Sequence, residues 1–413
     1  MLKPTALSTP GKRHRRLATR SRSSKSITSV PDSQPRAGPS VTISPFRKGR
    51  KGRKMKNYKL KWVDNTRLLA VLGVLSFHFY LQFGAPRPTL AQLVHTPHDV
   101  LMLPFHLGWF ADFLFFAISG LGLGMSAARN RKSWTRFYVD RVSKIYIPYW
   151  TAIVLMFAYQ GIASSIGTWD HLFVIPQTWQ GWVKDVLLIP QDPNTAFSTH
   201  FWFLPSLLVL YLAFPFAFKM IDRFGVFGFV AVLVLACSAH RMPIDLGPFN
   251  YAFMAFAWSP SFVIGAYIGV MLVKHPEQTD RWLMRTLPLG VVCLLVGTWA
   301  VMTDGKVWLG HPLLGFGTLS VSGALGRLPW HLPKLTAISF EVYLVHMPFA
   351  GWYRHFFGFV TSPKSLIYVF FLVSVWLMGA GVHWVAGAVE ARIRGVRKAA
   401  QPVSTAAAAV VQG

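Results

Sequence analysis

The chain has 413 residues, of which 53% are hydrophobic and only 14% charged, and its formal net charge is +27. Soluble domains normally have about a quarter of their residues charged, so this composition excludes an ordinary soluble fold and indicates a membrane protein. The two cysteines, Cys237 and Cys293, both lie in apolar runs, which excludes a disulfide framework and a cysteine-based zinc site.

The positive charge follows the pattern of a membrane protein rather than that of a nucleic-acid-binding one. Of the 42 lysines and arginines, 18 lie in residues 1–61, and most of the others lie in short loops between apolar runs. No stripe of basic residues alternates with aromatic ones outside those runs. We therefore expect a lipid bilayer, and no nucleic acid, as the partner of this chain.

The N-terminal extension, residues 1–57, is basic and rich in serine and proline. It has no apolar periodicity, so we expect it to be disordered, and it lacks the apolar core of a secretory signal peptide. Met55 begins a short basic lead into the first apolar run. The expectation is that residues 1–54 are dispensable and that Met55 is an alternative start.

The first apolar run, 64–83, contains Arg67 at its start and His78 well inside. Eleven residues make three helical turns plus 20°, so the two side chains share one helix face about 16 Å apart. Arginine binds phosphate bidentately, and imidazole transfers protons near neutral pH. The alternatives are an arginine that extends to the interface and a histidine that packs.

The second run, 104–127, contains an acidic residue at depth and an aromatic stretch followed by Ser-Gly. The residues concerned are Asp112, Phe115, Phe116, Ser119 and Gly120. A Gly-x-x-x-Gly spacing begins at Gly120 and another at Gly265, and we expect both to be helix-packing contacts.

Two basic residues, Arg141 and Lys144, come three apart just before the third run, 145–163. The long segment that follows, 164–200, is rich in tryptophan and proline, which favours a structure on the outer face, amphipathic or re-entrant, or a loop anchored at the interface by its tryptophans. Several histidines lie near or beyond this face, where most would be solvated and one would contact an acceptor. They are His95, His98, His106, His171 and His200.

Late in the chain, Glu341 lies in an apolar run and is followed by Tyr343, Leu344, His346 and Pro348. An acid in hydrocarbon normally faces the bundle interior and has a partner. Glu341 is therefore expected to be buried and paired, and it and Asp112 are the two candidates for orienting the His78 ring.

The sequence predicts an all-α polytopic membrane protein with ten transmembrane helices. The expected spans are 64–83, 104–127, 145–163, 201–218, 224–240, 251–273, 286–303, 308–325, 335–355 and 366–389. With both termini cytoplasmic, 17 basic residues after the first span fall inside and six outside, as the positive-inside rule requires. Residues 58–390 then form the membrane domain and residues 391–413 a disordered cytoplasmic tail.

Taken together in order and spacing, these motifs resemble the membrane acyltransferase-3 family over residues 58–390. The resemblance rests on the Arg67–His78 pair, the Asp112 to Gly120 stretch, the basic pair before the third span and the Tyr-Leu-x-His-x-Pro stretch. Lys144 departs from the family, in which arginine is commoner, and a lysine lacks bidentate geometry. In style the chain is most similar to members that act on exopolysaccharides and surface glycans.

The resemblance implies a multi-pass cell-membrane enzyme that transfers an acyl group, commonly acetyl from acetyl-CoA, to a hydroxyl of a glycan. It needs no bound cofactor and no metal, and its partners would include polysaccharide synthesis or export machinery. The implied catalytic residues are His78, Arg67, Asp112 and Glu341. The implied donor-binding residues are Arg67, Ser119, Arg141 and Lys144, and the other motif residues are Phe115, Phe116, Gly120, Tyr343 and His346.

Two other classes of function compete with this interpretation. A polysaccharide exporter or another secondary transporter would also have many spans with charges inside them, but transporters often contain internal repeats, and the two halves of this chain are not similar. A non-catalytic scaffold leaves the Arg67–His78 pair unexplained. The sequence leaves open the acceptor, the acyl group and whether transfer is direct or through a covalent intermediate.

Overall fold

Every secondary-structure element that the computed structural model describes is a helix. The chain divides into two units, Met1–Tyr58 and Lys59–Gly413, and all described residues belong to the second. They are 61–82, 107–129, 133–165, 176–190, 197, 199–239, 255–302, 307–330, 332–357 and 364–399. The expected N-terminal extension, 1–57, lies outside them.

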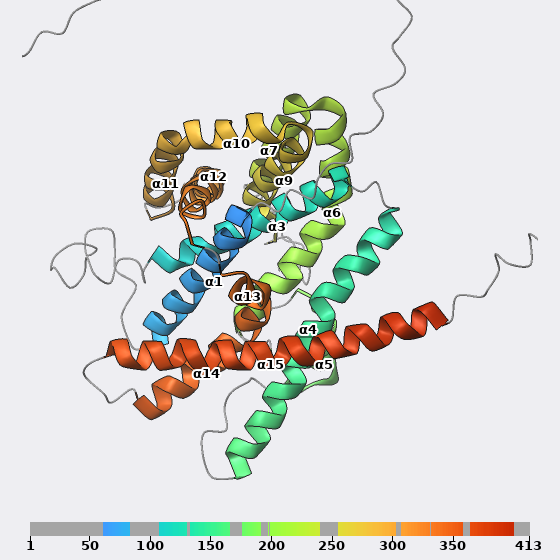
Figure 1. Ribbon diagram of the computed structural model, residues 1–413, viewed down its shortest axis with the longest axis vertical. Coiled ribbons are helices and arrows are strands. Elements are labelled where there is room, and N and C mark those ends of the chain that lie inside the picture. The colour runs from blue at the N-terminus through green and yellow to red at the C-terminus, as the bar shows by residue number, and fades with distance from the viewer. Residues whose placement is uncertain are drawn as a thin grey trace, which may run out of the picture. The chain divides into compact units, whose positions relative to one another are not determined.

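The helices coincide with the predicted apolar runs, in the order shown in Figure 1. They are α1 Lys61–Gln82, η2 Leu107–Trp109, α3 Phe110–Arg129, α4 Trp134–Ser165, α5 Trp179–Val186, η3 Thr199–Trp202, α6 Phe203–Phe224, α7 Val226–Ala239, η5 Ala255–Trp258, α9 Ser259–Lys274, α10 Pro276–Arg285, α11 Leu287–Met302, α12 Val307–Leu325, α13 Pro333–Ala337, α14 Ser339–Phe357 and α15 Lys364–Ala399. The all-α prediction is therefore confirmed for the described residues, and each of the ten expected spans falls on a helix.

Not all of these helices are long and apolar enough to cross a bilayer. Within the described ranges five meet that condition, namely Phe110–Arg129, Trp134–Ile162, His200–Phe224, Ala255–Lys274 and Ser365–Ile393. The pair α10 and α11, bent by 56°, makes a sixth if it counts as one span. The chain thus has several candidate spans, while ten spans and two cytoplasmic termini stay predictions.

Two helices are longer than the sequence predicted. Helix α4 begins at Trp134, so Arg141 and Lys144 lie on a helix and not in a loop before it. No glycine or proline occurs between Trp134 and Ile147, so nothing stops the helix from extending. Helix α15 continues to Ala399 through residues with high helix propensity. Residues 391–399, expected to be disordered, are therefore helical, and the rest of the predicted tail lies outside the described residues.

Helices α3 and α9 pack backbone against backbone through glycines. A Cβ placed on Gly265 would lie 1.8 Å from the carbonyl oxygen of Ala117, and one on Gly120 would lie 2.0 Å from that of Phe262. Such distances are possible only for glycine, and they recur at Gly124 and Gly269. The predicted role of both Gly-x-x-x-Gly spacings as packing contacts is confirmed.

The C-terminal pair of helices, α14 and α15, lies side by side, and α4 crosses α15 (Figure 1). Helix α14 also packs along α1. Many buried residues of α1, α4, α6, α14 and α15 belong to one hydrophobic core cluster. This arrangement brings the first and the last motifs of the sequence analysis, on α1 and α14, into contact.

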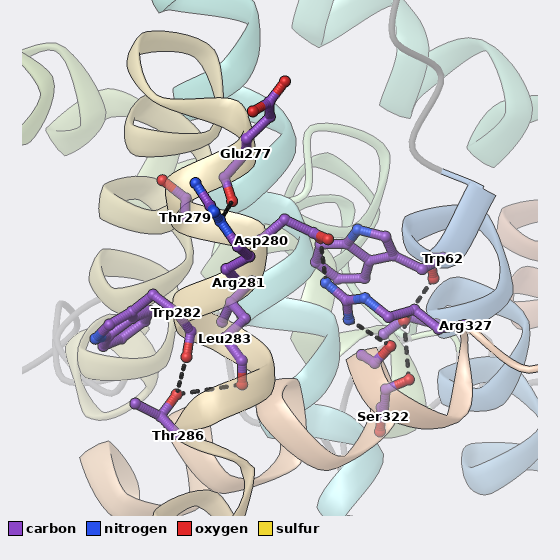
Figure 2. A network of polar contacts seen from close by, with 12 residues as sticks. Trp62, Glu277, Thr279, Asp280, Arg281, Trp282, Leu283, Thr286, Ser322 and Arg327 are labelled. Atoms are coloured by element: carbon purple, nitrogen blue, oxygen red, sulfur yellow. Dashed lines mark hydrogen bonds and ion pairs between the residues drawn. The ribbon is translucent and has the colours of Figure 1, made fainter. Parts of the chain in front are cut away.

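The first turns of α1 are fixed by contacts to the end of α12, where Arg327 also binds α10 (Figure 2). Arg327 forms an ion pair with Asp280 of α10, donates a hydrogen bond to the Gly323 carbonyl and lies over the Trp62 ring, 4.5 Å from its centroid. The Asn65 amide donates to the Gly326 carbonyl at 2.8 Å. These contacts hold the part of α1 that carries Arg67.

Candidate active site

His78 of α1 is hydrogen-bonded to His346 of α14. Nδ1 of His78 and Nε2 of His346 are 2.8 Å apart, and the ring centroids are separated by 4.9 Å. His346 is fully buried, with 0% of its surface exposed, and its Nδ1 lies 2.6 Å from the Tyr343 carbonyl oxygen. Two motifs that are 268 residues apart in the chain therefore form one site.

His200, at the start of the expected fourth span, joins the same site. The sequence analysis placed it among histidines at the outer interface that would mostly be solvated, and for His200 that expectation is wrong. It is only 2% exposed, and its ring centroid lies 4.8 Å from that of His346. We call His78, His200 and His346 the histidine cluster.

His200 reaches the cluster because the preceding segment folds back onto α4. Three side chains of α4 donate hydrogen bonds to consecutive carbonyls at the C-terminal end of α5: Tyr149 to Asp185, Trp150 to Val186 and Tyr146 to Leu187. The Asp185 carboxylate in turn accepts from the backbone N–H of Phe197. These contacts dock the end of α5 on the middle of α4, while the amphipathic or re-entrant character of segment 164–200 stays a prediction.

Two residues of the second span lie next to Tyr343, whose ring packs against His200 and His346. Asp112 of α3 interacts electrostatically with Tyr343 of α14. Phe115 packs against Tyr343, with ring centroids 5.9 Å apart, and Phe203 packs against Tyr343 at 5.5 Å. The Tyr343 hydroxyl donates a hydrogen bond to the His200 carbonyl. Asp112, Phe115 and Tyr343 thus lie where the sequence analysis expected site residues.

A second group of predicted site residues meets at Tyr211 of α6. The Tyr211 side chain interacts electrostatically with Arg141 and Arg67 and hydrogen-bonds to Ser119. These contacts bring together side chains of α1, α3, α4 and α6. We call Arg67, Ser119, Arg141 and Tyr211 the arginine cluster.

The two arginines of this cluster differ in their polar contacts. Arg67 is 3.8 Å from the Asp64 carboxylate one turn earlier, and its Nη2 would lie 3.7 Å from a Cβ on Gly122. The Nε of Arg141 is buried and has no hydrogen-bond partner among the described residues. Two guanidinium groups that converge on one hydroxyl pair are suited to bind an anion with several oxygens.

Four predicted site residues have other surroundings. Glu341 is buried and hydrogen-bonded to His383 of α15, with Oε1 and Nδ1 2.8 Å apart, so the expected buried partner is confirmed. Lys144 is exposed. Phe116 is stacked on Trp258, and Gly120 lies against α9. None of these contacts joins the four residues to the arginine cluster or to His78.

The described part of the chain holds no group of three or more His, Cys, Asp or Glu side chains that is arranged for a metal ion. The histidine cluster is held by ring-to-ring and ring-to-carbonyl contacts. Imidazoles can transfer protons between nitrogen and oxygen atoms.

A family model described as an acyltransferase domain matches residues 60–383. The match covers α1 to the middle of α15 and includes both clusters. The chain belongs to the membrane acyltransferase-3 family. No curated protein and no solved structure matches the chain.

Membership of the acyltransferase-3 family makes the protein a membrane acyltransferase. The family resemblance that the motifs predicted is thus confirmed. Two residues outside the predicted site also lie in the clusters: His200, which the sequence analysis named only among possible acceptor contacts, and Tyr211, for which it predicted no role. The signal for His200 was its place in the His-Phe-Trp-Phe stretch directly before an apolar run. For Tyr211 it was a hydroxyl inside an otherwise apolar run.

Proposed function

We propose that this acyltransferase transfers an acyl group, acetyl in the simplest case, from acyl-CoA to a hydroxyl of an extracellular polysaccharide or another surface glycan. The arginine cluster binds the phosphates of the donor. The histidine cluster activates the acceptor hydroxyl. The protein acts in the cell membrane, with both termini in the cytoplasm, next to the machinery that makes or exports the glycan.

The observation that carries this proposal is that one helix, α1, contributes a residue to each cluster. Arg67 and His78 are eleven residues apart, which is about 16 Å along the axis. A donor with a phosphate-bearing head and a long narrow arm matches two such sites on one helix. Neither a transporter nor a scaffold requires this combination of an arginine pair and a hydrogen-bonded histidine pair, of which His346 is buried.

The donor end uses charge. Arg67 and Arg141 provide planar guanidinium groups, and the hydroxyls of Ser119 and Tyr211 add polar contacts between them. Hydrogen bonds between arginine and phosphate are about twice as strong as those between neutral groups. Lys144, which is exposed on the same helix as Arg141, adds positive charge at the entrance without bidentate geometry.

The acceptor end uses proton transfer. A neutral sugar hydroxyl is a weak nucleophile, so it needs a base as it attacks the thioester carbonyl. His78 takes the hydroxyl proton while the new C–O bond forms. The tetrahedral intermediate then loses CoA as the thiolate, which receives the proton back from His78 and leaves as the thiol. Free imidazole, with a pKa near 6.5, is suited to both transfers.

Asp112 and Glu341 take different parts in this proposal. Asp112 lies on the histidine side through its interaction with Tyr343 and helps to orient that side of the site. Glu341 fixes α14 against α15 through His383. It therefore positions the helix that carries His346.

The test is the O-acyl content of the surface glycan, measured by NMR before and after mild alkali in a deletion strain and its complements. Wild-type protein and the control His355→Ala, whose side chain is exposed on α14, should restore alkali-labile acyl groups. His78→Ala should not, at equal protein level. Unchanged acylation in the deletion strain would contradict the proposal.

The same experiment separates the enzyme from the rival exporter. Loss of an exporter lowers the amount of glycan at the surface and leaves the acyl content of each repeat unchanged. Loss of the acyltransferase lowers the acyl content and leaves the amount of glycan unchanged. The amount is measured as total sugar released from washed cells.

A further inference from the structure

The hydrogen bonds of His346 determine where its proton lies. Its Nδ1 is 2.6 Å from the Tyr343 carbonyl oxygen, which can only accept. His346 therefore carries a proton on Nδ1. In a neutral ring the other nitrogen, Nε2, then has the lone pair and can only accept.

His346 is neutral because, among the described residues, no carboxylate is paired with its ring. The side chain is 0% exposed, and it packs between two other imidazoles and the ring of Tyr343. Burying an imidazolium in such surroundings costs several kcal/mol unless a carboxylate pairs with it. The contacts of His346 are instead a carbonyl oxygen and the Nδ1 of His78.

The state of His78 follows from that of His346. Since Nε2 of His346 accepts, the hydrogen bond of 2.8 Å between the rings must be donated by Nδ1 of His78. The neutral His78 ring then has its lone pair on Nε2. The nitrogen that points away from His346 is thus the basic one.

We infer that His346 is a positioning residue that holds His78 in the Nδ1–H tautomer, so that Nε2 of His78 is the nitrogen that takes the acceptor proton. The base role rests on the proposed function, whereas the tautomer does not. His346 does for His78 what a buried carboxylate does in a hydrolase triad, where it fixes the tautomer and orientation of the base. Here the neutral ring performs this task without placing a charge in the membrane interior.

Pro348 leaves a backbone carbonyl in the turn that carries His346 available for a contact from another helix. Proline has no backbone N–H, so the Leu344 carbonyl four residues earlier lacks its helical donor. His200 donates to that carbonyl from Nε2 at 3.2 Å, and Tyr343 donates from its hydroxyl to the His200 carbonyl. The Tyr-Leu-x-His-x-Pro stretch therefore binds η3 at two points and leaves His346 facing His78.

The test is solid-state NMR of the full-length protein in lipid bilayers, with ¹⁵N in the histidine rings. The nitrogen shifts distinguish the two neutral tautomers and the cation, and the His78 signals are those lost in His78→Gln. We expect protonated Nδ1 and unprotonated Nε2 for His78. We expect His346→Leu to convert part of His78 to the Nε2–H form, and His346→Gln, whose amide oxygen can replace Nε2 of His346, to preserve Nδ1–H.

Turnover supplies the second measurement, with acetyl-CoA as donor. Loss of a buried hydrogen bond typically changes a rate by about tenfold or more. His346→Leu should therefore lower kcat about tenfold or more and leave the KM for acetyl-CoA unchanged. His346→Asn should lower kcat as much as His346→Leu does, because the asparagine amide reaches the Tyr343 carbonyl but is too short to reach His78. His346→Gln should stay near wild type.

Two results would overturn the inference. One is a wild-type His78 that is protonated on Nε2, alone or together with Nδ1. The other is a His346→Gln variant that is as impaired as His346→Asn, since a residue that only packs makes no such distinction. The NMR measurement needs no substrate, so its result stands even if the protein fails to use acetyl-CoA.

Discussion

Tyr211 is the residue at which the contacts of the arginine cluster meet. It interacts with Arg67 of α1 and Arg141 of α4 and shares a hydrogen bond with Ser119 of α3. A tyrosine in an apolar run ordinarily packs, and its hydroxyl normally needs a partner when it is buried. Here that partner is Ser119, a predicted donor-binding residue, so the proposed donor site includes Tyr211.

Arg141→Gln should weaken donor binding more than it slows the reaction. The change removes one charged hydrogen-bond donor to phosphate, worth about 1.5–3 kcal/mol, so the KM for acetyl-CoA should rise about 10- to 150-fold. The matched control is Arg136→Gln, an exposed arginine on the same helix, which should leave KM unchanged. A fall in kcat at constant KM would move Arg141 out of the donor site.

Tyr211→Phe should have a smaller effect of the same kind. It removes one neutral hydrogen bond, about 0.5–1.5 kcal/mol, so KM for acetyl-CoA should rise about two- to tenfold. Tyr267→Phe, on α9 and stacked against Phe229, serves as the control for loss of a hydroxyl. Equal donor kinetics in the two variants would make Tyr211 a packing residue.

For individual residues, the sequence predicted those site members that are polar groups within apolar runs. It missed those that reach the site only because a distant segment folds back onto it. Arg67, His78 and Asp112 stood out as polar groups in apolar runs. His200 looked like a surface residue because it ends a long segment that was expected on the outer face. Its contacts with Leu344 and Tyr343 of α14 bring it inside.

Among the elements, α3 carries the tightest packing and also a large part of the site. One face holds glycines against α9, and the other presents Asp112, Phe115 and Ser119 to α14 and α6. The glycine contact therefore fixes the depth and rotation of the site residues. The sequence predicted this packing because glycines four apart align on one helix face.

Gly265→Ala should destabilise the protein. Its Cβ would lie 1.8 Å from the Ala117 carbonyl oxygen, so α3 and α9 must separate, at a cost of about 1–3 kcal/mol. The melting temperature in detergent should fall accordingly. Gly381→Ala on α15 is the control, because no atom lies within 4 Å of its Cβ, and it should stabilise the helix slightly. A Gly265→Ala variant that melts at the same temperature as the Gly381→Ala control would contradict the close packing of α3 against α9.

Helix positions followed from the apolar runs, whereas helix ends did not. The polar stretch before Ile145 looked like a loop because it carries several charges, yet no residue in it stops a helix, and α4 begins at Trp134. Helix α15 likewise continues past the last apolar residues. A change in polarity marks the edge of the bilayer rather than the end of a helix.

For the molecule as a whole, the proposal needs the two clusters to face opposite sides of the membrane. Donor phosphates come from the cytoplasm and the glycan from outside. The distribution of basic residues predicts that α5 lies outside and the start of α4 inside. The direction of α1 between the arginine and histidine clusters depends on this topology.

Cysteine labelling tests this predicted topology directly. In a variant in which Cys237 and Cys293 are serine, Lys184→Cys on the exposed face of α5 should react with an impermeant maleimide on intact spheroplasts. Arg136→Cys, exposed near the start of α4, should react only after permeabilisation. The reverse pattern would place the arginine cluster on the outer side and contradict the donor assignment.

The central claim is that the protein moves an acyl group from acyl-CoA to a glycan hydroxyl and that His78 acts as the base. The most direct measurement uses purified protein in lipid nanodiscs, ¹⁴C-acetyl-CoA and surface glycan from the host cells that has been freed of acyl groups by mild alkali. Wild-type protein and His355→Ala should place alkali-labile label on the glycan. His78→Ala should be slower by about 10²–10⁴-fold and equally stable. Two results would contradict the account: wild-type protein that transfers no label to the glycan, or His78→Ala protein that transfers label at the wild-type rate.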